Sequence, residues 1–187
     1  WVRRLFSENN LSVNDLILPI FIREGRKKVE KIKSMPGVYR YSIDTLPKVL
    51  DKVEKFKIPM IALFPYTPNN KRNKNGSEAL NENNLICRGL RFITKRYKKF
   101  GIMTDVALDP YTSHGHDGIM NGKIIDNDKT LKILNNQALL QASMGSDIIA
   151  PSDMMDGRIG SIRKFLEKNN FKNVKILSYA VKYASSF

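Results

Sequence analysis

Pro59-Met-Ile-Ala-Leu-Phe64 is a short apolar run set between a helical pattern and a long polar segment, and it indicates how the rest of the chain is organised. Similar runs, rich in β-branched residues, occur at residues 16–22, 101–108, 147–150 and 174–180. Each run is bounded by polar residues, Gly or Pro, a pattern typical of strands that are buried on both faces of a parallel sheet. The sequence therefore predicts five β-strands.

Stretches with helical periodicity separate most of these runs. We expect helices at residues 45–56, 85–100, 129–144 and 159–168. The first places Leu46, Val49, Leu50 and Val53 on one face, with Asp44 as its expected N-cap. The expected caps of the later helices are Asp126 and Asp128 for residues 129–144, and Asp156 or Gly157 for residues 159–168.

The alternation of strand and helix predicts an α/β protein whose parallel strands are joined by helical crossovers. A TIM (β/α)8 barrel and an open doubly wound sheet both fit this pattern. Five units in 187 residues leave the chain short of a complete barrel, which typically takes about 250 residues. We expect residues 1–187 to form a single partial TIM-barrel domain with roughly the first five βα units. The polar insertion at residues 66–84 is expected to be a mobile surface loop or an active-site lid.

Composition excludes several classes of protein. With 42% hydrophobic and 27% charged residues, the chain is neither collagen-like nor fully disordered. Its single cysteine, Cys87, cannot form an internal disulfide, which fits a reducing compartment. No apolar run approaches the roughly 18 residues of a membrane-spanning helix. The N-terminus has neither Met nor a signal peptide, and it suggests a chain that begins within a longer protein.

The net charge of +14 raises the question of nucleic acid binding. Lys outnumbers Arg by 21 to 11, and Asn and Ile are abundant, as AT-rich coding sequence would produce. No zinc-finger spacing, recognition helix or aromatic RNA-binding motif accompanies the charge. We therefore expect a solvated basic surface, with no nucleic acid partner.

Polar stretches that could carry chemistry follow three of the predicted strands, at the sheet edge where parallel α/β proteins bind ligands. The first, at residues 104–118, contains Asp105, Asp109, His114, His116 and Asp117. Carboxylates and imidazoles in this combination suit a metal site or a proton relay. The alternative is an ordinary loop, because Asp, Gly, Pro and Ser also form turns.

The second stretch is Ala150-Pro-Ser-Asp-Met-Met-Asp-Gly-Arg158, which is either functional or a helix-capping loop. Arg158 in the first turn opposes the helix dipole, so we expect an anionic partner for it. Met154 and Met155 are expected to be packing residues.

The third stretch, residues 177–187, contains Lys182 as its only charged residue. A lysine among apolar neighbours is desolvated, which lowers its pKa and leaves a fraction as the free amine. A free amine can attack a ketone to form a Schiff base, so Lys182 is the candidate nucleophile. The alternative is a surface lysine at a strand end.

These stretches together resemble the porphobilinogen synthase family, also called 5-aminolevulinate dehydratase. Asp-Val-Ala-Leu-Asp-Pro-Tyr-Thr-Ser-His-Gly-His-Asp-Gly, Ala-Pro-Ser-Asp-Met-Met-Asp-Gly-Arg and Ser-Tyr-Ala-Val-Lys-Tyr-Ala-Ser-Ser-Phe resemble that family in order and spacing. Leu18-Pro-Ile-Phe-Ile, Ser34-Met-Pro-Gly-Val and Ala62-Leu-Phe-Pro are similar to its early barrel segments. The resemblance covers essentially the whole chain.

The resemblance implies a TIM barrel that joins two molecules of 5-aminolevulinate into porphobilinogen with loss of two waters. Lys182 matches the first of the family's two Schiff-base lysines. Asp105, Asp109, Asp117 and Ser152 match substrate-binding positions, and Asp153 matches a residue near the family's regulatory magnesium, which it is expected to contact through water. Family members with catalytic zinc carry cysteines where this chain has Ala107, Asp109 and Asp117. The resemblance therefore implies the aspartate-type, magnesium-responsive branch, without zinc and without an organic cofactor.

The resemblance also implies that the chain stops before the family's second lysine and last barrel units, and lacks most of the N-terminal arm that joins subunits into a homo-octamer. We therefore expect the 187 residues alone to be inactive. A bacterial cytoplasm is the expected compartment, with the plastid as the alternative. A class I aldolase-like Schiff-base lyase and a basic nucleic-acid-binding module are the competing functions.

Overall fold

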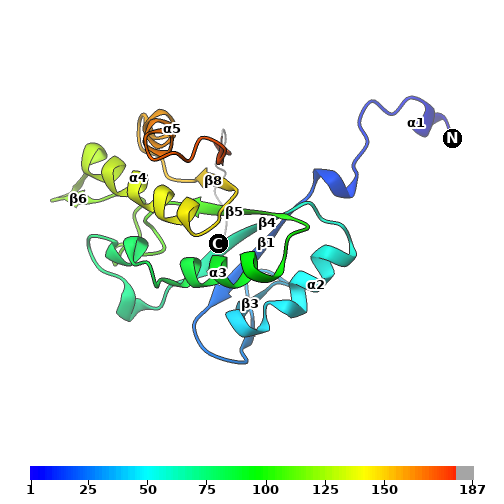
Figure 1. The fold of residues 1–187 in the computed structure, drawn as a ribbon, viewed down its shortest axis with the longest axis horizontal. Helices are drawn as coiled ribbons and strands as arrows, with labels where there is room; N and C mark the ends of the chain where they lie inside the picture. The colour runs from blue at the N-terminus through cyan, green and yellow to red at the C-terminus, as the bar shows by residue number, and fades with distance from the viewer. Residues whose placement is uncertain (180–187) are drawn as a thin grey trace.

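The computed structural model describes residues 1–179 and contains a seven-stranded sheet (Figure 1). The order of the strands in the sheet is β2-β3-β1-β4-β5-β8-β9. All neighbouring strands are parallel except β2 and β3, which are antiparallel. The strands are β1 (Ile17–Arg23), β2 (Val29–Lys31), β3 (Tyr39–Ser42), β4 (Met60–Tyr66), β5 (Gly101–Val106), β8 (Ile148–Pro151) and β9 (Lys175–Ile176).

Most of the sheet is added on one side of β1. In the series β1-β4-β5-β8-β9 each parallel strand lies next to the one before it, whereas β3 and β2 lie on the other side of β1. The long crossover helices are α2 (Pro47–Lys55), α3 (Leu85–Arg96), α4 (Asn127–Ser143) and α5 (Arg158–Lys168). The consecutive order of these five strands, together with the position of all four helices on one face, is that of a (β/α)8 barrel and not of a doubly wound sheet.

Both faces of the sheet are covered, but by different groups. On the outer face, Ile20, Leu63 and Ile102 pack with the buried side chains of α2 and α3, while Val106 and Ile149 pack with those of α4 and α5. The inner face, on the opposite side, has a smaller cluster of Ala62, Met103 and Ala150, against which Phe64, Leu177 and Tyr179 pack. All four long helices therefore lie on the outer face, as in a TIM barrel.

The first four predicted strands are confirmed, with small shifts at their ends. The fifth, predicted at residues 174–180, forms only the two-residue strand β9 within the described residues. The antiparallel pair β2 and β3 was not predicted, nor was the two-stranded hairpin of β6 (Met120–Asn121) and β7 (Ile124–Ile125). The predicted helices are confirmed as well, and Asp126 caps α4 by accepting a hydrogen bond from the Lys129 N–H at 3.0 Å. Asp128 lies inside the first turn of α4.

The prediction that Asp44 caps α2 is wrong. The N-cap is Leu46, which has no capping side chain, and Pro occupies the first turn of the helix. Asp44 instead accepts a hydrogen bond from the backbone N–H of Lys27 at 2.8 Å. A contact with a residue 17 positions away in the chain has replaced the local cap.

The polar insertion forms a packed segment, residues 67–84, with the 3-10 turns η3 (Asn69–Lys71) and η4 (Ser77–Leu80). Ala79 is buried among Leu108 and Tyr111 in the outer-face core. Gly76 adopts a left-handed conformation with φ of 58°, and a Cβ atom there would lie 3.5 Å from the side chain of Thr112. The segment is therefore built into the fold against the residues that follow β5.

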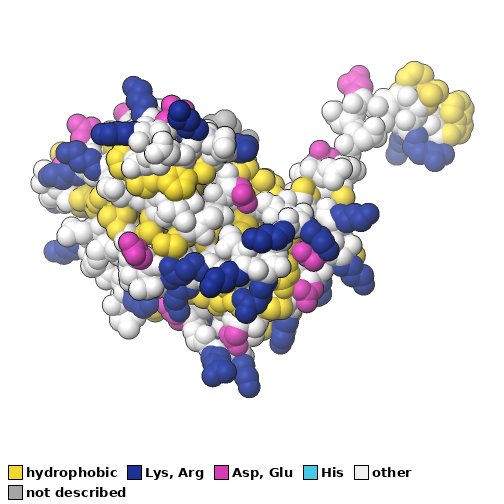
Figure 2. Space-filling model, in the orientation of Figure 1, with side chains coloured by type: hydrophobic (Ala, Val, Ile, Leu, Met, Phe, Trp, Pro, Cys, Tyr) yellow, Lys and Arg dark blue, Asp and Glu magenta, His cyan; other side chains and the backbone are white. Residues whose placement is uncertain are grey.

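The N-terminal residues, including α1 (Val2–Leu5), extend away from the sheet (Figure 1). Several of their large apolar side chains are exposed: Trp1, Val2, Leu5, Phe6 and Leu11. Figure 2 shows Lys and Arg side chains spread over the visible face among acidic and apolar ones. Among residues 1–179, no helix is both long and apolar enough to cross a membrane.

Candidate active site at the carboxyl ends of the strands

Asp105 lies on the inner face near the end of β5. Its neighbour Thr104 points outward, because its hydroxyl group donates to Gln141 of α4 at 2.8 Å. Side chains alternate along a strand, so Asp105 points inward, in register with Ala150 of β8. Burial and the nearby charge of Asp105 both raise the pKa of Tyr179, which also packs on the inner face. The carboxylate therefore lies beside apolar and aromatic side chains.

Ser152 follows β8 directly and is held by a hydrogen bond from its N–H to the Val106 carbonyl at 3.3 Å. Two positions beyond Ala150, it falls on the same side of the sheet as Asp105. The structure thus brings these two predicted substrate-binding residues to the carboxyl ends of adjacent parallel strands. This is the edge at which barrels and other parallel α/β proteins bind their ligands.

Two buried glutamines of α4 hold the backbone at the end of β5. Gln141 donates to the carbonyl of Asp105 at 2.9 Å, and Gln137 donates to the carbonyl of Ala107 at 3.2 Å. They are 2% and 1% exposed, so their amide groups reach these carbonyls without competition from water. Sequence reasoning missed both, because a glutamine in a helix gives no local sign of a partner 30 or more residues away.

Asp109 lies in the turn after β5, close to Tyr111. Tyr111 is 3% exposed, and burial raises its pKa strongly, with the charges of Asp105 and Asp109 adding to the effect. Both acids therefore lie close to one buried phenol. The Tyr111 ring packs in the outer-face core, which ties the turn to the body of the protein.

Asp117 lines a cavity of about 380 Å³ together with His116, Ile125, Asn127, Met154 and Met155. Asp153 lies near this cavity, and its side chain is buried. Burial raises the pKa of Asp153 to about 6, and the charge of Asp117 adds to the rise while Arg158 opposes it. Asp117 and Asp153, from two different predicted stretches, are therefore neighbours in the structure.

The expected anionic partner of Arg158 is Asp153, whose Oδ2 lies 3.4 Å from the guanidinium Nε. Gly157 is the N-cap of α5, as one of the two predicted alternatives had it. Met155 is buried in the core as expected. The same prediction is wrong for Met154, which is 67% exposed and lines the cavity together with Met155.

The two histidines interact with each other. The backbone N–H of His116 donates to Nδ1 of His114 at 3.2 Å, and the rings lie 5.6 Å apart. Nε2 of the same His114 ring lies 3.3 Å from the carbonyl oxygen of Lys74. Within residues 1–179, no three His, Cys, Asp or Glu side chains are grouped as metal ligands, so the suggested metal site of residues 104–118 is not assembled there.

Lys182, the predicted nucleophile, lies outside the described residues. The other predicted residues form two groups on successive loops. Asp105 and Ser152 belong to adjacent strand ends, and Asp117 and Asp153 lie at or beside the cavity. Each group offers carboxylates that can attract a cationic group and accept protons.

Comparison with known proteins agrees with this arrangement. A sequence profile of the delta-aminolevulinic acid dehydratase family matches residues 1–187. The dehydratase of Bradyrhizobium diazoefficiens is 51% identical over the whole chain, which spans 53% of that protein. That of Ruminiclostridium josui is 46% identical, and the chain covers 90% of it. The chloroplastic enzyme 1 of Arabidopsis thaliana is 44% identical over 99% of the chain, which covers 43% of it.

The structural comparison extends to the whole described fold. A crystal structure of the Toxoplasma gondii porphobilinogen synthase, in complex with its reaction product porphobilinogen, superposes with a TM-score of 0.94 at 36% sequence identity. The match covers 99% of this chain and 53% of that one, so the chain spans about half the length of most of these relatives. This match confirms that the chain forms roughly the first five βα units of a TIM barrel. By sequence and by fold, the chain belongs to the delta-aminolevulinic acid dehydratase family.

Proposed function

We propose that the full-length protein is a porphobilinogen synthase, which condenses two molecules of 5-aminolevulinate into porphobilinogen and releases two waters. The observation that supports this most directly is the position of Asp105 and Ser152 at the carboxyl ends of adjacent strands, in a sheet that matches a product-bound relative. Asp117 lines the cavity in the loop that follows β5. Because the chain spans about half the length of the first relatives, the activity is proposed for the complete polypeptide.

The proposed reaction begins at Lys182. Its free amine attacks the ketone carbon of one 5-aminolevulinate, and the carbonyl oxygen leaves as water to form a Schiff base. Asp109 and Asp117 receive the second substrate, because carboxylates attract its ammonium group and accept protons as the ring closes. Asp105 and Ser152 line the same edge. The covalent step is carried by an amine of the protein, so no organic cofactor is required.

We further propose the aspartate-type branch, in which magnesium regulates activity and zinc is absent. Zinc in the other branch needs thiolates, and the one cysteine, Cys87, is buried in α3, where burial raises its pKa to about 11. Oδ1 of Asp153 accepts the Met155 N–H at 2.8 Å and Oδ2 faces Arg158. These contacts fit a magnesium ion that keeps its water shell and meets Asp153 through it.

The first experiment is reductive trapping. The full-length protein and the 187-residue chain are each incubated with 5-aminolevulinate and borohydride, and the adduct is located by peptide mass spectrometry. We expect a reduced adduct on Lys182 in the full-length protein and none in Lys182→Ala. Absence of both adduct and porphobilinogen in the full-length protein would overturn the proposal. We expect the 187-residue chain to form no porphobilinogen.

The same samples test the competing functions. An aldolase-like lyase would also form an adduct on Lys182, but its product would not give the coloured reaction of a pyrrole with acidic aldehyde reagent. A nucleic-acid-binding protein would bind RNA with an affinity that falls steeply with salt, and Lys182→Ala would leave this affinity unchanged. We expect pyrrole formation and no salt-sensitive RNA binding.

We propose a homo-octamer for the full-length protein, supported by the exposed apolar side chains near the N-terminus, such as Trp1 and Phe6. Sedimentation velocity is the test. The proposed compartment is a bacterial cytoplasm, with the plastid as the alternative, because relatives named chloroplastic match at 42–44% identity and a Bradyrhizobium relative matches at 51%.

A further inference from the structure

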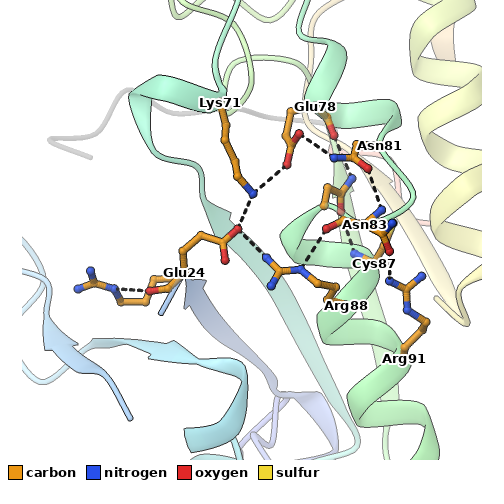
Figure 3. Close-up of polar contacts among 10 residues, drawn as sticks. Glu24, Lys71, Glu78, Asn81, Asn83, Cys87, Arg88 and Arg91 are labelled. Atoms are coloured by element: carbon orange, nitrogen blue, oxygen red, sulfur yellow. Dashed lines mark hydrogen bonds and ion pairs between the residues drawn. The ribbon is translucent and has the colours of Figure 1, made fainter. Parts of the chain in front are cut away.

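Glu24 is the meeting point of three parts of the fold (Figure 3). It follows β1 directly, and its Oε1 accepts hydrogen bonds from Lys71 Nζ at 2.7 Å and from an Arg88 terminal nitrogen at 2.5 Å. Lys71 belongs to the 67–84 segment and Arg88 to α3. Its carboxylate is 31% exposed, so water screens these ion pairs only in part.

The ion pairs of Glu24 fix the 67–84 segment at two positions. Lys71 Nζ also lies 3.4 Å from Glu78, whose side chain is only 14% exposed. Arg88 donates through Nε to the carbonyl of Asn83 at 3.0 Å. One end of the segment is therefore held through Lys71, and the other through the arginine that binds the same Glu24 oxygen.

The opposite side of the 67–84 segment holds the loop that carries the candidate site. The Asn73 N–H donates to the Tyr111 carbonyl at 3.2 Å, and the Ser113 N–H donates to the Asn73 carbonyl at 3.1 Å. These two hydrogen bonds form a parallel bridge between the segment and the residues that lie between Asp109 and Asp117. The Asn73 side chain shapes the turn by accepting from the Ser77 N–H at 3.2 Å.

Electrostatics make Glu24 the critical member of this group. Burial opposes its ionisation, but the hydrogen bonds from Arg88 and Lys71 lower its pKa, so it is charged at neutral pH. Without that charge, Lys71 would keep its ion pair with Glu78, which belongs to the same segment, and Arg88 would keep its hydrogen bond to the Asn83 carbonyl. Removing Glu24 therefore breaks the link between the end of β1 and these two cations and leaves their like charges less well neutralised.

We propose that Glu24 is a positioning residue: it anchors the 67–84 segment and, through Asn73, fixes the loop that carries Asp109 and Asp117. The consequence for catalysis rests on the proposed function, whereas the coupling between Glu24 and the loop does not. The 67–84 segment thus connects the end of β1, through Lys71, with the loop of the candidate site, through Asn73. It is neither a lid nor a free surface loop.

Hydrogen exchange of the 187-residue chain tests the coupling without any activity. We expect the Asn73 and Ser113 amides to exchange about five to ten times faster in Glu24→Gln and in Lys71→Met, because the bridge opens more often when the anchor is weakened. The amides of β4 should not change. Glu54→Gln, which removes an ion pair with Lys99 on the α2 side of the fold, is the matched control and should leave both amides as they are.

Unchanged exchange at Asn73 and Ser113 in both anchor variants would overturn the coupling. In the full-length protein, we expect Glu24→Gln to raise the KM for 5-aminolevulinate about tenfold at the second substrate position, with a smaller fall in kcat. Faster exchange with native KM and kcat would overturn the positioning role. If the native full-length protein makes no porphobilinogen, the proposed function fails, and the exchange result still decides whether Glu24 holds the loop.

Discussion

Oδ2 of Asp153 lies 3.4 Å from Nε of Arg158, yet within the described residues neither atom forms a hydrogen bond. The two groups attract each other without the geometry that would compensate for the burial of the carboxylate. This explains why the pKa of Asp153 is raised to about 6 although an arginine lies beside it. The group is poised to change its charge close to physiological pH.

A first prediction concerns the stability of the chain as a function of pH. The folded-state pKa of Asp153 lies above its ordinary value of 3.8, so the folded chain binds the proton more tightly than the unfolded chain. The stability contributed by this protonation is complete below pH 3.8 and is lost as the pH rises through about 6. Asp153→Asn, which stays neutral, should be more stable than the native chain by about 2 kcal/mol at pH 8 and equal to it near pH 4.

Urea denaturation of the 187-residue chain at the two pH values measures this difference. Asp156→Asn is the matched control, since Asp156 is exposed and its substitution should have no pH-dependent effect on the free energy of unfolding. A native chain that is more stable than Asp153→Asn at pH 8 would show that the ion pair with Arg158 outweighs the burial of the carboxylate.

A second prediction concerns Gln141. Replacement by Met keeps the shape of the side chain but removes the donor to the Asp105 carbonyl and the acceptor from the Thr104 hydroxyl. We expect a loss of about 2–3 kcal/mol in the free energy of unfolding, because buried polar groups lose their partners. Asn136→Ala, at an exposed position of the same helix, should change stability by less than about 0.5 kcal/mol. Similar urea midpoints for the two variants would contradict the role of Gln141.

A third prediction compares two glycines. A Cβ atom at Gly118 would lie 2.6 Å from a methyl carbon of Ile125 and 2.9 Å from the hydroxyl oxygen of Thr130, whereas one at Gly160 would meet nothing within 4 Å. Gly118→Ala should therefore destabilise the chain by about 1–3 kcal/mol. Gly160→Ala, within α5, should stabilise it by about 0.5–1 kcal/mol. Thermal unfolding of the pair checks both signs, and a shift of the same sign in both would count against the close packing beside Asp117.

A fourth prediction concerns metals in the full-length protein. If Asp109 and Asp117 mark the aspartate-type branch, a zinc-selective chelator should leave porphobilinogen formation unchanged, and added magnesium should raise it. The rate is measured with the aldehyde reagent before and after chelation. Activity that disappears with the chelator and returns with zinc alone would refute the assignment.

The pattern of apolar and polar residues in the sequence predicted the main strands and helices well, because apolar runs and helical periodicity are local properties. It missed β2 and β3, whose pairing depends on a contact between Glu30 and Arg40 across the two strands. It also misplaced Asp44, which binds the distant Lys27 N–H and does not cap the nearest helix. The errors occur where a long-range contact outweighs a local preference.

In the candidate site, too, local sequence patterns were predictive and long-range contacts were not. Polar residues directly after apolar runs indicated Asp105 and Ser152 correctly as strand-end residues, because the carboxyl ends of parallel strands share one edge. Nothing local indicated that Gln141 holds the Asp105 carbonyl, or that Glu24 is linked to the loop after β5 through the 67–84 segment. Such contacts join residues that are far apart in the chain and form only when the strands and helices have packed together.

The strand order has a consequence for how the chain assembles during synthesis. From β1 to β9, each parallel strand of the barrel wall pairs with one that precedes it in the chain, so its hydrogen-bonding partner has already left the ribosome when it emerges. Each crossover helix then closes over strands that are already in place. The wall can therefore be extended one unit at a time from β1 towards β9. Among the described strands, growth takes place at one edge of the sheet, while β2 forms the opposite edge.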